Sequence, residues 1–342
     1  MFRRPRAAAC LASGLLALGV TPSVLASEAF PWLDTGFLLF GDVYHIPSHH
    51  LESGDGATGL VLRRGYLTWN LDWADVWFGR VRLELNQSGE FETYDFELDF
   101  KDFYVGTRVG GHTAIFGLSP TLTFDVVESA WGKRHLLRTP LDLQGEPSRD
   151  TGASLKGPMD AEGRFSYRVM LGSGAEFGAE AGDGRKLMFA LNWKITDRWM
   201  VDVYGDGEKL EGPTDRRTWQ VFTEYDAEDW RLGALYADQD RQEDPPLEVA
   251  SAWWIRRLGP GSELVTRIDR VFEPSPRGDN NAYIPFDPSA PATMFYAGIE
   301  FTLGEHLSLT PNVIVTAYDR NDEGVRPETD VYLRLTAFVN FE

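Results

Sequence analysis

Residues 73–87 read WADVWFGRVRLELNQ, and from Trp77 onward the side chains alternate between two faces of an extended strand. One face carries Trp77, Gly79, Val81, Leu83 and Leu85, and the other carries Phe78, Arg80, Arg82, Glu84 and Asn86. An arginine facing the middle of a lipid bilayer costs roughly 2–4 kcal/mol. If this strand crosses a membrane, Arg80 and Arg82 must therefore face enclosed water, and the apolar face must meet hydrocarbon.

The same period of two recurs along most of the chain, for example in residues 187–195 and 331–341. Pro311 interrupts it within residues 307–317, because proline cannot donate a ladder hydrogen bond. These patterns predict an all-β, antiparallel transmembrane barrel of about sixteen strands. The expected strands are 36–46, 57–71, 73–87, 92–109, 111–118, 150–157, 163–173, 184–196, 197–210, 216–226, 228–238, 247–257, 261–272, 293–303, 306–318 and 329–341.

The connections between the expected strands alternate in length. The short ones fall at Asp72, Gly110-Gly111, 158–162, Thr196-Asp197, Ala227, 258–260 and Gly304-Glu305. The longer ones include 47–56, 119–149, 173–183, 239–246, 273–292 and 319–328. Bacterial outer-membrane barrels have short periplasmic turns and longer outer loops, whereas a soluble sandwich has no reason to sort its loops in this way.

Aromatic side chains flank several of the short turns, as expected where hydrocarbon meets headgroups. The pairs are Trp69 with Trp73, Trp193 with Trp199, Tyr225 with Trp230, and Trp253 with Trp254. Ordinary core aromatics are the alternative interpretation of the same residues. The inward face, by the same alternation, includes Arg64, Asp99, Lys101, Arg168 and Arg334.

The first 26 residues have the layout of a secretory signal peptide. Three arginines precede the apolar stretch 7–20, and Val24-Leu25-Ala26 resembles a cleavage site. Cleavage after Ala26 would leave residues 27–342 as the barrel domain. It would shorten the chain from 342 to 316 residues, change the formal net charge from −19 to −22 and remove the only cysteine, Cys10.

Composition excludes several classes of protein. With 52 acidic and 33 basic residues the chain repels polyanions, so we expect no nucleic-acid partner. After the first 30 residues no apolar run reaches the roughly 20 residues of a membrane helix. A barrel remains possible, because its strands are only half apolar.

Residues 119–149 form the longest stretch without strand alternation. Loops of this length are usually functional or disordered, and the apolar residues here favour packing. We expect this third outer loop to fold into the lumen and narrow it, so that Lys133, Arg134 and Arg138 meet solutes. Bracing the wall or covering a neighbouring subunit is the alternative role.

Three patches of sequence resemble the phosphate-selective porin O and P family. They are Leu62-Arg63-Arg64-Gly65-Tyr66-Leu67, Ile115-Phe116-Gly117-Leu118-Ser119-Pro120 and residues 149–157, RDTGASLKG. The long loop between strands five and six also resembles the constriction loop of sixteen-stranded porins. The resemblance implies a trimeric channel in the outer membrane of a Gram-negative bacterium, open to small and often anionic solutes. No phosphate ligand of that family can be matched residue by residue.

The predicted function is therefore passive diffusion of small hydrophilic solutes or ions through a water-filled barrel. The expected partners are these solutes, outer-membrane lipid, lipopolysaccharide and two further copies of the chain. Positive charges that draw anions are predicted at Arg64, Arg80, Arg82, Lys133, Arg134, Arg138, Arg168 and Arg334. An opposing acidic side is predicted at Glu84, Asp99, Asp125 and Glu128.

We expect no enzymatic activity, cofactor or resident metal. The sequence has no Gly-x-Ser-x-Gly nucleophile elbow, and no cysteine follows Ala26. His45, His49 and His50 could hold a metal with Asp42. They lie at the tip of the first hairpin, where solvated polar residues are expected, and this second interpretation is the preferred one. Two rival functions remain: a plugged barrel with a structural or adhesive role, which would not conduct, and a secreted carbohydrate-binding β-protein, which would not enter membranes.

Overall fold

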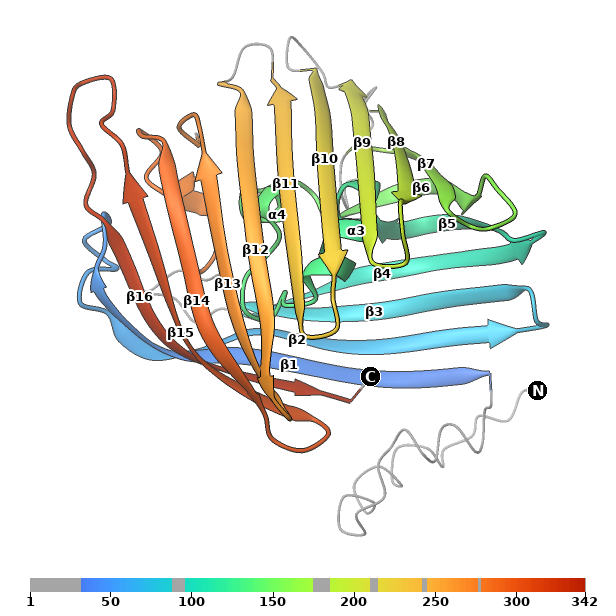
Figure 1. Ribbon diagram of the computed structural model, residues 1–342, viewed down its shortest axis with the longest axis horizontal. Coiled ribbons are helices and arrows are strands. Elements are labelled where there is room, and N and C mark those ends of the chain that lie inside the picture. The colour runs from blue at the N-terminus through green and yellow to red at the C-terminus, as the bar shows by residue number, and fades with distance from the viewer. Residues whose placement is uncertain are drawn as a thin grey trace, which may run out of the picture.

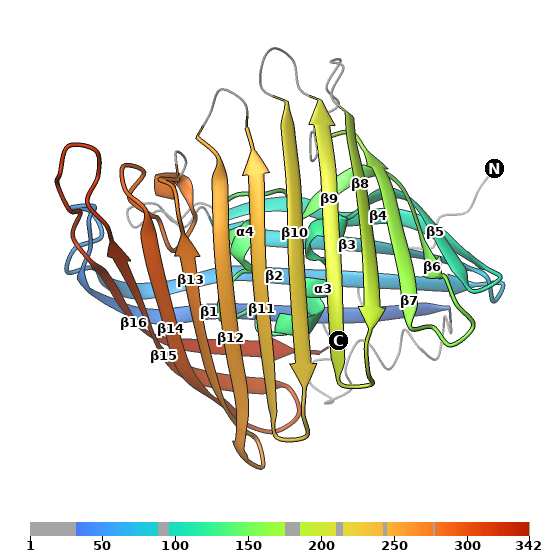
Figure 2. The ribbon, with the colours of Figure 1, turned by 45° about the horizontal axis from the view of Figure 1, so that its top comes forward.

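The computed structural model describes residues 32–87, 96–174, 185–209, 215–241, 245–275 and 278–341. The predicted signal peptide, residues 1–26, lies outside these residues. Sixteen antiparallel strands form one closed barrel in which each strand pairs with its neighbours in sequence, and β1 closes the ring by pairing with β16 (Figures 1 and 2). Closure leaves no strand edge unpaired, which is what a sheet in hydrocarbon requires.

The first eight strands are β1 (Leu33–Ser48), β2 (Thr58–Trp73), β3 (Trp77–Gln87), β4 (Phe96–Val109), β5 (His112–Pro120), β6 (Arg149–Pro158), β7 (Phe165–Gly172) and β8 (Arg185–Lys194). The second eight are β9 (Trp199–Lys209), β10 (Arg216–Asp226), β11 (Trp230–Asp240), β12 (Leu247–Gly259), β13 (Ser262–Val271), β14 (Ala292–Thr302), β15 (Leu307–Tyr318) and β16 (Asp330–Asn340). Each lies close to a predicted segment, so the predicted barrel and strand count are confirmed.

The short and long connections lie at opposite ends of the barrel, called here the turn end and the loop end. Connections at the turn end have two to six residues, and those at the loop end have six to 28. The prediction that the first short turn lies at Asp72 is wrong. Strand β2 continues to Trp73, which pairs with Trp77, and the turn is formed by residues 74–76. Ala74 and Asp75 there take positive φ angles of 54° and 61°, a conformation for which alanine gives no sequence signal.

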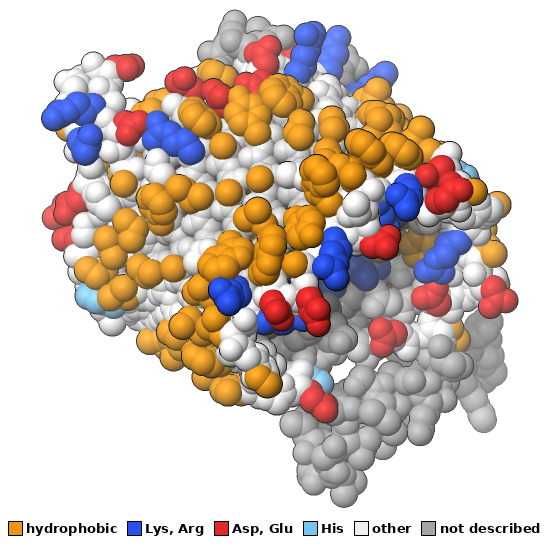
Figure 3. Space-filling model, in the orientation of Figure 1, with side chains coloured by type: hydrophobic (Ala, Val, Ile, Leu, Met, Phe, Trp, Pro, Cys, Tyr) orange, Lys and Arg blue, Asp and Glu red, His pale blue; other side chains and the backbone are white. Residues whose placement is uncertain are grey.

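Alternation of burial along the strands confirms the predicted faces. In β8, Lys186, Met188, Ala190 and Asn192 are buried, whereas Leu187, Phe189, Leu191 and Trp193 are exposed. Figure 3 shows one side of the barrel, where apolar side chains spread over much of the visible wall and charged side chains gather at its upper edge and in a group below the centre. An exposed apolar band of this kind suits a wall that meets hydrocarbon.

Most of the predicted turn-end aromatics lie on the outward face, with Trp73, Trp193, Trp199, Tyr225 and Trp230 all exposed. Trp253 was assigned wrongly to this group. It points inward, is 1% exposed and stacks on Phe222 with ring centroids 5.2 Å apart. The adjacent Trp253-Trp254 pair necessarily places one ring on each face of the strand, and only Trp254 faces outward.

Pro311 lies within β15, as the sequence suggested, and its effect is local. The ladder between β14 and β15 is broken between the pairs Gly298–Asn312 and Phe301–Leu309, whereas pairing with β16 continues through Pro311 and Leu335. The missing N–H therefore affects one side of the strand only.

Two short helices lie within the outline of the barrel in both ribbon views: α3 (Leu122–Trp131) and α4 (Pro140–Leu143) (Figures 1 and 2). A large apolar core forms where these helices and residues 284–290 meet the inward face of β10–β15, and it extends to Ile46 of β1 and Tyr332 of β16. Among the described residues, no helix is both long enough and apolar enough to cross a membrane.

The assignment of faces can be tested by substituting Leu191, which is outward and 39% exposed near the middle of β8. We expect Leu191→Arg to lower the free energy of unfolding by roughly 2–4 kcal/mol, because the guanidinium would meet hydrocarbon. Urea titration of the protein in lipid vesicles measures the change. The matched control is Ser166→Arg on the inward face of β7, where we expect a change within about 0.5 kcal/mol. Equal losses in both variants would contradict the assignment.

Candidate functional site

The segment between β5 and β6, residues 121–148, packs on an apolar part of the inner wall. Helix α3 begins after Thr121 and ends at Gly132, whose φ of 60° suits a glycine at a helix C-terminus. Phe124, Val127 and Trp131 belong to the buried core together with Trp253 of the wall. The rings of Trp131 and Trp253 meet edge to face with centroids 5.5 Å apart. Aromatic burial therefore fixes the helix to the barrel.

Side chains of the wall also hold the backbone of this segment. Arg334 donates to the carbonyl oxygen of Leu136 at 2.9 Å, and Arg231 donates to that of Ala130 at 3.0 Å. Further bonds of the same kind come from Arg63, Gln220 and Arg267, which donate to the carbonyls of His135, Thr123 and Arg138. Donors on five strands thus satisfy carbonyl groups that have no strand partner.

Several of the cations predicted to meet solutes are instead buried in ion pairs. Arg64 lies 2.6 Å from Glu84, and Arg168 lies 2.6 Å from Asp202. Lys133 lies 2.8 Å from Glu300 and 2.7 Å from Glu263. A cation removed from water needs a close partner of opposite charge, so these pairs hold the inner structure together. Sequence alternation predicts direction but cannot reveal such a partner.

Two other predicted cations, Arg334 and Arg138, contact the segment 121–148, the wall or the loop after β13. Arg334 contacts Asp42 at 3.5 Å in addition to the carbonyl of Leu136, and its side chain is 3% exposed. Arg138 donates to the carbonyl of Ala282 in the loop after β13. Their contacts join the segment 121–148 and the neighbouring loop to the wall.

The remaining predicted cations keep access to the lumen. The side chains of Arg80, Arg82 and Arg134 are 31%, 16% and 17% exposed. Arg134 also forms two close ion pairs, with Glu128 and Asp142, each at 2.7 Å. Arg80 and Arg82 each lie 3.8 Å from Asp102, which Arg149 also contacts at 2.6 Å. Three guanidinium groups therefore share one carboxylate, and the group carries a net positive charge.

The predicted acidic residues do not form one opposing wall. Glu84 lies among the cations, 2.6 Å from Arg64 and 3.0 Å from Lys101. Glu128 lies 2.7 Å from Arg134. Asp125 lies 3.8 Å from both Lys156 and Arg168, and Asp99 is exposed on β4 opposite Glu84. Acidic and basic groups are interleaved on this part of the wall.

Sequence reasoning missed Asp102, because β4 has a bulge. Arg82 pairs with Asp102, but the next residue, Leu83, pairs with Phe100, so Lys101 is the extra residue. The bulge lets both Lys101 and Asp102 face inward, where strict alternation allows only one of them. A similar irregularity in β2 places both Arg63 and Arg64 inside. Bulges leave no clear signal in a single sequence.

A cavity of about 200 Å³ lies between the segment 121–148 and the inner wall formed by β16 and β1–β4. Four cations and one carboxylate line it: Arg82, Lys101, Arg134, Arg149 and Glu128. The rest of its lining is Leu38, Phe40, Tyr66, Gly132, His135 and Phe338. Among the lining side chains, positive charge thus exceeds negative charge. Three carboxylates outside the lining, Asp102, Glu84 and Asp142, pair with these cations.

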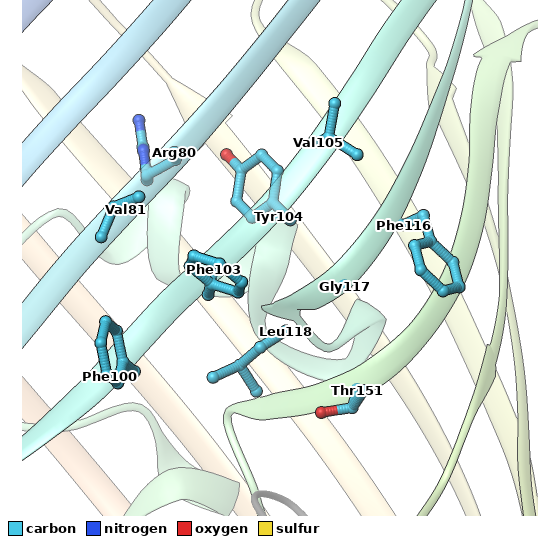
Figure 4. Close-up of a pocket in the computed structure, with 10 residues that line it drawn as sticks. All are labelled: Arg80, Val81, Phe100, Phe103, Tyr104, Val105, Phe116, Gly117, Leu118 and Thr151. Carbon is cyan, nitrogen blue, oxygen red and sulfur yellow. The ribbon is translucent and has the colours of Figure 1, made fainter. Parts of the chain in front are cut away.

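A larger hollow of about 700 Å³ has a different character. Its lining includes outward-facing Val81, Phe103, Val105 and Phe116, and Figure 4 shows the aromatic rings spread along β4 and β5. The exposure of Phe103, Val105 and Phe116 places this hollow on the outer surface of the wall. Its mainly apolar lining offers little to a hydrophilic solute.

Asp42 is a critical buried anion of the inner wall. It lies 2.8 Å from Arg63 and 3.5 Å from Arg334, and it accepts a hydrogen bond from Thr336. We expect Asp42→Asn to lower the free energy of unfolding by about 3–5 kcal/mol, because two buried cations would lose their counter-charge. Urea-unfolding midpoints measure the loss. Asp34→Asn, an exposed carboxylate on the same strand, is the control, and an equal effect there would contradict this role.

Comparisons with known proteins identify the fold. No family model and no curated protein sequence matches this chain. An anion-selective porin from Comamonas acidovorans is 13% identical and has a TM-score of 0.64, with 90% of this chain and 99% of that chain covered. OprB of Pseudomonas putida is 9% identical with a TM-score of 0.67, covering 93% and 96%. A trimer form of OmpT from Vibrio cholerae is 12% identical with a TM-score of 0.57, covering 90% and 99%. At these identities the likeness concerns the transmembrane barrel fold.

Proposed function

We propose that this protein is a porin of a bacterial outer membrane that lets small hydrophilic solutes diffuse passively, with a preference for anions. The turn end would face the periplasm and the loop end the outside, as in other barrels of this construction. Residues 1–26 would direct export and be cleaved after Ala26. The closed wall, its apolar outer band and its charged interior support this proposal.

The cavity of about 200 Å³ beside the segment 121–148 is the observation that carries the anion preference. Four cations and one carboxylate line it, and Arg80 adds a further charge beside Asp102. Pores select ions by rings of charge at their narrow points. A local excess of positive charge there would raise the concentration of anions relative to cations.

The acidic character of the whole chain does not oppose this preference. The charge of −22 expected after cleavage is spread over the full length, whereas permeating ions pass the cavity at close range. At physiological ionic strength, charges more than about 8 Å away through water are largely screened. The nearby guanidinium and ammonium groups would therefore dominate the field on the solute.

Arg80, Arg82 and Arg134 are the best candidates for solute contact, because they combine exposure with a position beside the cavity. Arg64, Lys133, Arg138, Arg168 and Arg334 would act mainly by fixing the segment 121–148 and the wall. Selectivity for phosphate, suggested by the resemblance to the porin O and P family, stays a prediction.

We also propose that the protein forms a homotrimer and contacts lipid and lipopolysaccharide around its outer surface. The trimer form of a protein with this fold supports such an assembly. The apolar hollow on β3–β6 would lie in the contact between subunits, where another apolar surface would fill it. The mass of the purified assembly in detergent measures the subunit number.

A plugged barrel is the rival function, because the segment 121–148 fills part of the interior. Planar-bilayer recording separates the two functions and tests ion preference in one experiment. In a KCl gradient we expect discrete conductance steps and a reversal potential with the sign of anion selectivity. Absence of steps, or a cation-selective reversal potential, would overturn the proposal.

A double variant that neutralises Arg80 and Arg82 tests whether these residues cause the anion preference. Arg80→Gln with Arg82→Gln should keep the conductance steps and reduce the anion-to-cation permeability ratio, because Asp102 remains paired with Arg149. The matched control is Arg185→Gln with Lys209→Gln, which removes two exposed cations that pair across β8 and β9 on the outward face. We expect the control to retain the ratio of the unmodified protein. Equal shifts in both variants would show that the cavity has no special role.

A further inference from the structure

His49, His50 and Asp330 meet where the barrel closes at its loop end. The histidines follow directly after β1, and Asp330 is the first residue of β16. The pairing of Ser48 with Val331 brings the two strands together at this point. The side chains of all three residues are at most 3% exposed. One ligand atom from each residue lies within 4.8 Å of those of the other two.

Asp330 is a buried carboxylate whose charge is not balanced by lysine or arginine. Among the described residues, its ion-pair partners within 4 Å are His49 and His50 only. It accepts hydrogen bonds from the backbone N–H of His50 at 2.7 Å and from the hydroxyl of Tyr318 at 2.5 Å. These are dipoles, and a carboxylate removed from water requires a compensating positive charge.

The hydrogen bonds of His49 fix its tautomer. Its Nδ1 atom accepts a hydrogen bond from the backbone N–H of Leu51 at 2.9 Å, so Nδ1 carries a lone pair. Its Nε2–H must then donate to the hydroxyl of Tyr332, 2.8 Å away. The Nδ1 atom lies 3.9 Å from Oδ1 of Asp330. Because its one lone pair accepts the N–H of Leu51, a metal ion bound at this atom would replace that hydrogen bond.

His50 completes this group of ligand atoms. Its Nδ1 atom lies 2.9 Å from each carboxylate oxygen of Asp330, and its ring stacks on His49 with centroids 4.5 Å apart. Two imidazole nitrogens and one carboxylate are a common ligand set for Zn²⁺ and similar ions. The hydrogen bond of Tyr332 to Nε2 would orient the ring of His49, and that of Tyr318 would orient the carboxylate of Asp330. Residues that hydrogen-bond to metal ligands commonly orient them in this way.

We propose that His49, His50 and Asp330 bind a divalent transition-metal ion such as Zn²⁺ at the loop end of the barrel. The ion would neutralise Asp330 and connect the first loop to the last strand across the seam between β1 and β16. His45 and Asp42, considered from the sequence, take no part. The ring of His45 contacts Thr58, and Asp42 pairs with Arg63 inside the barrel.

The test is calorimetric titration of Zn²⁺ into the purified, chelator-washed protein in detergent. We expect one ion per chain and, on Zn²⁺ addition, a higher unfolding temperature. Asp330→Asn and His50→Ala should each weaken Zn²⁺ binding by about tenfold or more. His45→Ala is the matched control on the same hairpin and should bind like the unmodified protein.

Conductance recordings on the same samples serve as a control that each variant is folded. They also test the porin function independently of Zn²⁺ binding. Loss of Zn²⁺ binding in the Asp330 and His50 variants with unchanged conductance supports the site. No Zn²⁺ binding by the unmodified protein, equal weakening in the His45 variant, or binding that survives Asp330→Asn would overturn it.

Discussion

The exclusion of water from the bilayer core is the constraint on which this structure depends. Every backbone N–H and C=O group within hydrocarbon must have a protein partner, and a closed antiparallel ladder meets that demand. The pairing of β1 with β16 removes the last two free edges. The same constraint sorts side chains, because a charged group facing lipid costs several kcal/mol. Alternation of apolar and polar residues follows directly from these two requirements.

The interior is divided into two parts with different roles. The inward face of β10–β15 is largely apolar and packs against α3, α4 and residues 284–290. The inward face of β1–β4 is polar and charged, and it borders the cavity with its excess of cations. The apolar half fixes the segment 121–148, and the charged half is the part that we propose meets solutes. Buried ion pairs such as Lys133 with Glu300 also join this segment to the wall at β14.

Sequence alone could predict the fold because its main signal is local. The two faces of residues 77–86 could be assigned from one fact, that charged side chains avoid lipid. In the structure Arg80 and Arg82 share the inward face with Asn70 and Thr68, to which they donate hydrogen bonds. Strand number and the sorting of connections followed from the same local pattern.

The details of the interior depended on partners far away in sequence or on local irregularities. Alternation showed that Arg168 faces inward, but not that Asp202 neutralises it. The bulge at Lys101 turned Asp102 inward, and Trp253 proved to be a core residue because its side of β12 faces α3. His50 and Asp330 are 280 residues apart, so no spacing rule could connect them.

The most direct test of the account uses the absence of cysteine after residue 26. A single cysteine can be introduced by Arg82→Cys or by Val81→Cys, and each protein can be reconstituted into lipid vesicles. The rate of labelling by a negatively charged, membrane-impermeant thiol reagent is then measured. The account predicts rapid labelling at position 82 and slow labelling at position 81 until detergent is added. Equal rates, or faster labelling at position 81, would contradict it.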